Sequence, residues 1–147
     1  MKIEEKQDTL EILNYVVRNT QMGCNTLNQL CEDAKTSALK KELETQKEHY
    51  SEVLNKATVM LHNMGEDAEK LGPMTKVSTY VGVAANTMRD SSPRHMADML
   101  IQGSTMGVVD ITKRLKDYPN VTPEAHALAD SLMHFEQDNI EHLKAFL

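Results

Sequence analysis

Two short motifs in this chain place a side-chain amide three residues before a histidine. They read Gln-Lys-Glu-His at 46–49 and Asn-Ile-Glu-His at 139–142. Residues three apart lie on one face of a helix, so an acid in the first position and a histidine in the last would ligate a metal ion together. Here an amide stands where each acid would be. The motifs therefore indicate a metal-binding arrangement that has lost its anionic ligands.

The same replacement recurs on four long amphipathic stretches. Each stretch has an apolar seam with steps of three and four residues, which predicts a helix. One small polar or amide side chain interrupts each seam near its middle: Thr20, Gln46, Ser104 and Asn139. A pair of divalent cations in an apolar core needs anionic ligands to offset the lost hydration, and hydroxyls and amides do not supply them. We therefore expect a neutral polar core layer whose members hydrogen-bond to one another.

Capping and breaking residues delimit the first pair of helices. The first helix is predicted from about 7 to 33, and a short turn at 34–36 follows it. The second helix is predicted to run to Met64, because Gly65 favours the left-handed conformation that ends a helix. A turn this short makes the two helices antiparallel neighbours.

The second pair of helices begins at two similar signals. Ser-Pro at 92–93 and Thr-Pro at 122–123 each combine an N-cap residue with a proline in the first turn. The third helix is expected to end at Asp117. The long connection at 65–92 is expected to contain a short helix over 74–89, and its length lets the second and third helices lie parallel.

With this topology and these motifs, the chain resembles the ferritin-like superfamily, and more narrowly the small bacterial ferritin-like domains of unassigned role. The resemblance implies an all-α, ferritin-like four-helix bundle of two antiparallel hairpins with a long crossover, as one domain over 1–147. It also implies an inward acid between Thr20 and Cys24 and a Gly-acid pair at Gly103 and Ser104. Neither acid is present. The preferred interpretation is a degenerate, carboxylate-poor metal site in a structural or interaction protein that is not an enzyme and has no cofactor.

The histidines leave an alternative open. Under it, His49, Glu52 and His142 would bind iron or manganese, and acids such as Asp138 or Glu141 would turn inward through a shifted register. The protein would then be a di-iron or di-manganese protein or an oxidase-type enzyme. Otherwise the histidines are hydrogen-bonded or partly exposed.

Counting residues along the predicted helices weakens one of the two motifs. Gln46 lies about 10 residues into its helix and Asn139 about 17 into its own, which at ~1.5 Å per residue is a difference of roughly 10 Å. Phe135 is therefore predicted to match Gln46 better in level than Asn139 does.

Composition sets the remaining expectations. The 147 residues carry a net charge of -6, which argues against a nucleic-acid partner. No apolar run is long enough for a membrane span and the first residues do not form a signal peptide, so a cytoplasmic location is expected. Cys24 and Cys31 are too far apart on one helix to form a disulfide and are read as buried thiols. Gly103 and Gly107 would allow close approach of another helix, from the connection or a partner subunit, and we expect self-association as a dimer or higher oligomer.

Overall fold

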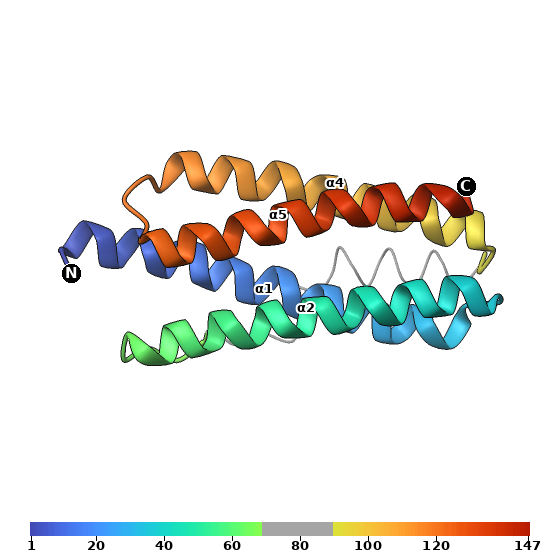
Figure 1. The fold of residues 1–147 in the computed structure, drawn as a ribbon, viewed down its shortest axis with the longest axis horizontal. Helices are drawn as coiled ribbons and strands as arrows, with labels where there is room; N and C mark the ends of the chain where they lie inside the picture. The colour runs from blue at the N-terminus through green and yellow to red at the C-terminus, as the bar shows by residue number, and fades with distance from the viewer. Residues whose placement is uncertain (69–89) are drawn as a thin grey trace.

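The computed structural model describes residues 1–68 and 90–147, and within these ranges every regular element is helical. Four long helices form a bundle (Figure 1). They are α1 (Ile3–Asp33), α2 (Ser37–Asn63), α4 (Pro93–Asp117) and α5 (Pro123–Leu143), and the short 3₁₀ turn η1 (Lys144–Phe146) follows. The predicted all-α bundle is confirmed at this level. The short helix expected over 74–89 lies outside the described residues.

The helix starts of the second hairpin are confirmed, and the caps explain them. The Ser92 side chain accepts a hydrogen bond from the backbone N–H of His95 at 3.3 Å. The Thr122 side chain accepts one from Ala125 at 3.4 Å. Each cap satisfies a backbone donor that has no partner within its helix, and a proline occupies the first turn of both helices.

The ends of the first hairpin follow the same chemistry. Thr36 caps α2 by accepting from the backbone N–H of Leu39 at 3.2 Å. Gly65 has a φ of 78°, so the predicted left-handed stop after the second helix is confirmed. The first helix, however, begins at Ile3 and not near residue 7, because the Glu, Lys and Gln residues at 4–7 favour a helix and no proline or glycine interrupts them.

The two hairpins are antiparallel pairs whose turns lie at opposite ends of the bundle (Figure 1). α1 packs mainly on α2, and α4 packs mainly on α5. α5 also contacts both α1 and α2, so it joins the hairpins. As the colours of Figure 1 show, α2 and α4 run in the same direction.

This arrangement overturns the predicted mismatch in level between Gln46 and Asn139. His142 pairs with Glu42, and the rings of Phe135 and His49 are 3.9 Å apart. Along two antiparallel helices these contacts place Asn139 opposite position 45 or 46, and Phe135 about one turn away. Residue counts from the two helix starts begin at opposite ends of the bundle, so a count of 10 and a count of 17 describe nearly the same level.

The hydrophobic core follows the predicted seams most closely on α2. Its buried residues are Leu39, Leu43, Gln46, Tyr50, Val53, Ala57 and Leu61. In the last turn the buried residue is Leu61, and the neighbouring Met60 is only partly buried. On α4 the apolar side chains of Ile101 and Val108 are only half-buried, whereas Gly107 is buried. Both cysteines are free thiols.

A polar contact ties the first helix to the turn of the second hairpin. The carboxylate of Asp8 accepts a hydrogen bond from the backbone N–H of Asn120 at 2.8 Å. The hydroxyl of Thr9 accepts one from the backbone N–H of Thr122 at 3.0 Å. These two bonds hold the start of α5 against α1. None of the described helices has a stretch apolar and long enough to cross a membrane.

Candidate functional site

A buried carboxyl group lies at the centre of the bundle, and the sequence analysis did not predict it. Glu136 on α5 is 2% exposed. Its Oε1 accepts a hydrogen bond from the Tyr50 hydroxyl at 2.9 Å. The side chains of Ser104 and Asn19 also interact with this carboxyl group and, like Tyr50, lower its pKa. Asn19, Tyr50, Ser104 and Glu136, here called the Glu136 cluster, come from α1, α2, α4 and α5, so all four helices meet at this point.

Two glycines make room for the cluster. A Cβ atom added at Gly107 would lie 2.9 Å from Oε2 of Glu136, closer than real Cβ atoms approach other atoms. A Cβ atom added at Gly23 would lie 3.1 Å from the Tyr50 ring. Gly107 therefore lets the carboxyl group rest against the backbone of α4 within the same chain. This contact explains why a glycine is needed at position 107 and does not require a partner subunit.

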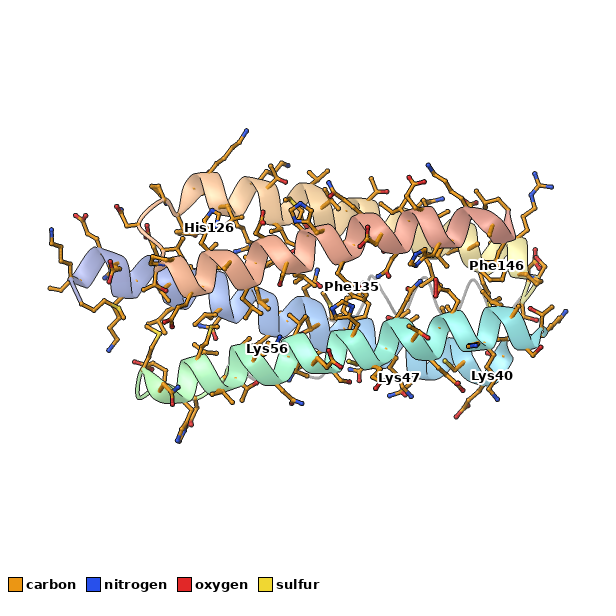
Figure 2. All side chains as sticks on the ribbon, viewed as in Figure 1. Lys40, Lys47, Lys56, His126, Phe135 and Phe146 are labelled. Carbon is orange, nitrogen blue, oxygen red and sulfur yellow. The ribbon has the colours of Figure 1, made fainter. Side chains whose placement is uncertain are left out.

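Burial dominates the acidity of Glu136. It raises the pKa of the carboxyl group from its ordinary 4.5 to about 7, and the hydrogen bond from Tyr50 and the polar side chains of Ser104 and Asn19 oppose this rise. Near neutral pH the group is consequently divided between its protonated and ionised forms. An aromatic contact supports the arrangement, because the Tyr50 and Phe135 rings meet edge to face with centroids 4.8 Å apart. Figure 2 shows Phe135 between α5 and α2.

The four seam residues singled out in the sequence are all buried. Thr20 donates its hydroxyl to the backbone carbonyl of Val16 at 2.8 Å, within its own helix. Ser104 joins the Glu136 cluster. The side-chain nitrogens of Gln46 and Asn139 are buried with no hydrogen-bond partner among residues 1–68 and 90–147. The expected mutual hydrogen bonds among the four are therefore not formed, because Thr20 bonds to its own helix and the amide donors of Gln46 and Asn139 stay unpaired.

The three proposed metal ligands occupy separate surroundings. His49 is exposed and its ring lies against that of Phe135 at an angle of 48°, and Glu52 is exposed on the same helix. Nδ1 of His142 lies 3.1 Å from a carboxylate oxygen of Glu42. In the part of the chain that the structure describes, no three His, Cys, Asp or Glu side chains are grouped as metal ligands. Metal binding by these residues stays a prediction.

The donors around Glu136 do not suit a pair of divalent ions. A phenol, a hydroxyl and an amide are neutral, and one carboxylate cannot offset four positive charges in a medium of low dielectric constant. The arrangement suits a proton, which a single carboxyl group can bind and which neutral hydrogen-bond partners tolerate. Its chemical capacity is thus to hold one exchangeable proton inside the bundle.

Two sequence signals point to Glu136 in retrospect. It lies four residues after Leu132 and three before Asn139, so it continues the apolar seam of α5. Gly107, in the middle of a helix, marks a place where another group comes close. Neither signal outweighs the strong preference of glutamate for solvent.

Comparison with known proteins supports the fold. No protein-family model matches the chain, and no curated protein matches it significantly. A solved structure, the DUF305 fragment from Deinococcus radiodurans, superposes with a TM-score of 0.74 over 94% of this chain and 93% of that one. The sequences are 12% identical, so the similarity concerns the helical fold alone.

Proposed function

We propose that the chain is a ferritin-like four-helix bundle with a structural or interaction role, in which a hydrogen-bonded carboxyl group occupies the place of a di-metal centre. The parallel direction of α2 and α4 supports the ferritin-like topology (Figure 1). The observation that carries the proposal is the Glu136 cluster. One member comes from each helix, and a single carboxyl group is surrounded by neutral donors.

Loading the protein with Fe(II) or Mn(II) tests this proposal. The purified chain is incubated with either metal, with and without oxygen, then desalted, and the metal is counted per chain. We expect only a small fraction of an ion to remain and no oxygen consumption, because the cluster lacks the negative charge that a metal pair requires.

Glu136→Gln serves as the control, since it keeps the shape and removes the ionisable group. It should hold as little metal as the unmodified protein. Two tightly held ions per chain with oxygen consumption would overturn the proposal. Loss of that metal in His49→Ala or His142→Ala would then assign it to the alternative ligand set of His49, Glu52 and His142.

Self-association is the form of interaction that we propose for this bundle. Met106 and Val109 on α4 are 56% and 46% exposed and lie three residues apart on one helix. Residues at this spacing are neighbours on the helix surface, so the two side chains form a small apolar patch. Such a patch is suited to contact with a second copy of the chain.

A further inference from the structure

A cavity of about 100 Å³ adjoins the Glu136 cluster between α1, α2 and α4. Tyr50 and Ser104 line it and also belong to the cluster. Much of the remaining wall is aliphatic or thioether, from Leu27, Leu100 and Met99. The cavity is therefore an apolar space with a few polar groups on one side, which is the usual composition of a small-molecule site.

Gln46 is the polar group that this cavity leaves unsatisfied. Its side chain is 3% exposed and lines the cavity. The side-chain nitrogen is buried without a hydrogen-bond partner in the described ranges. An amide NH₂ group carries two donors, and a buried donor without a partner is destabilising. A molecule that offers an acceptor at this point would relieve that penalty.

The charge of the wall restricts the kind of molecule. None of the described residues that line the cavity is charged. Against these described residues, a carboxylate or phosphate would leave water without meeting a cation, and an ammonium group would meet no anion. Only an uncharged molecule avoids that cost.

Size and access complete the description. An apolar cavity of about 150 Å³ holds benzene, so the present volume encloses roughly four non-hydrogen atoms, and a five-membered ring would fill it and extend toward its open side. Gln102 and Met106 line the cavity and are themselves exposed, so they mark the side that reaches the surface. The flexible Met106 side chain can move aside without disturbing the core.

We propose that this cavity binds a small uncharged molecule with an apolar body and a carbonyl or equivalent acceptor, which the side-chain amide of Gln46 recognises. The site does not depend on the proposed structural role or on a metal, so a failed metal experiment leaves it standing. It shares Met106 with the patch proposed for self-association, and a second copy bound there would cover the open side of the cavity.

Two probes of equal size test the proposal on the unmodified chain. Cyclopentanone carries the acceptor, and methylenecyclopentane replaces its oxygen by a CH₂ group. In a ¹H–¹⁵N NMR titration, cyclopentanone should shift the Gln46 side-chain NH₂ signals and the backbone signals of Leu27 and Leu100 in a saturable way. Methylenecyclopentane should bind about tenfold more weakly, because it leaves the amide donor without a partner.

Variants separate recognition by Gln46 from filling of space. Gln46→Met has a similar shape and no donor, so the tenfold preference for cyclopentanone should disappear. Thr26→Leu fills part of the cavity and should weaken both probes. The exposed Gln137 on α5 provides the matched control, and Gln137→Met should leave both affinities unchanged.

Three outcomes would overturn the proposal. The first is the absence of saturable shifts at the lining residues, which means that the cavity holds water only. The second is equal binding of the two probes to the unmodified chain. The third is an undiminished preference in Gln46→Met. The first two are read from the unmodified protein and do not depend on the folding of any variant.

Discussion

Glu136 binds its proton more tightly in the folded chain than in the unfolded one, because burial disfavours the carboxylate. Below the unfolded value of 4.5 the group is protonated in both states and adds no pH dependence. Between 4.5 and about 7 the folded state holds more protons, so stability falls as pH rises. Above the folded pKa the group is ionised in both states, and the stability gained from the bound proton is fully lost.

Glu136→Gln should remove this pH dependence. We expect the unmodified protein to lose about 3 kcal/mol of unfolding free energy between pH 4.5 and pH 8 relative to the variant, since one pKa unit corresponds to about 1.4 kcal/mol. Urea unfolding of both proteins across this range measures the difference, in which the contributions of all other groups cancel.

Glu141→Gln is the matched control, since Glu141 is exposed on the same helix. Its unfolding free energy should follow that of the unmodified protein at every pH. A difference between Glu136→Gln and the unmodified protein that stays constant with pH would show that Glu136 is not buried as an acid.

The burial of a residue could be predicted where it follows from the spacing along one helix. It could not be predicted where it depends on contacts with other helices. The positions of Gln46 and Ser104 follow from the three-and-four spacing alone. Glu136 satisfies the same spacing, but its burial depends on Tyr50, Ser104 and Asn19, which lie on three other helices. Contacts between helices cannot be read from the periodicity of one helix, so the central acid was missed.

At the scale of the helices, the close approach of α4 and α5 depends on the absence of a side chain at Gly107. The Glu136 carboxyl group fills the space that a Cβ atom would take. The helix thus gives up about 1 kcal/mol of intrinsic helix stability, which alanine would provide, in order to admit the carboxyl group.

Gly107→Ala should destabilise the protein by about 1 to 2 kcal/mol, because overpacking against Glu136 outweighs the gain in helix propensity. In the background of Glu136→Ala the obstruction is gone, and the same change should stabilise by up to about 1 kcal/mol. Chemical unfolding of the four proteins in this cycle gives both values. Equal effects in the two backgrounds would contradict the packing described for Gly107.

Helix boundaries were largely predictable, and the relative placement of the helices was not. The caps at Ser92 and Thr122 act within one turn, so local sequence determines them. The relation between Gln46 and Asn139 depends instead on the two hairpin turns lying at opposite ends of the bundle (Figure 1). This is a property of the assembled chain, and counting along each helix from its own start led to the wrong level.

At the scale of the whole molecule, the apolar patch of Met106 and Val109 leads to a prediction about assembly. Light scattering should give twice the chain mass of 16.6 kDa, and Val109→Lys should reduce it to that of one chain, because a charge at the contact would be buried without a partner. Val59 on α2 is 57% exposed and serves as the control. Val59→Lys should leave the mass unchanged, and a single-chain mass for the unmodified protein would contradict the proposal.

The bonds from Asn120 to Asp8 and from Thr122 to Thr9 have a consequence for how the chain folds. They join residues more than a hundred positions apart, whereas each helical hairpin closes through a short turn. The N–H groups of Asn120 and Thr122 lie just before α5, and in these two bonds both donate to side chains of α1, in the other hairpin. Their exchange with deuterated solvent therefore reports the docking of one hairpin on the other, separately from the formation of the helices. During refolding, the Thr122 amide should become protected from exchange only when the second hairpin docks on the first.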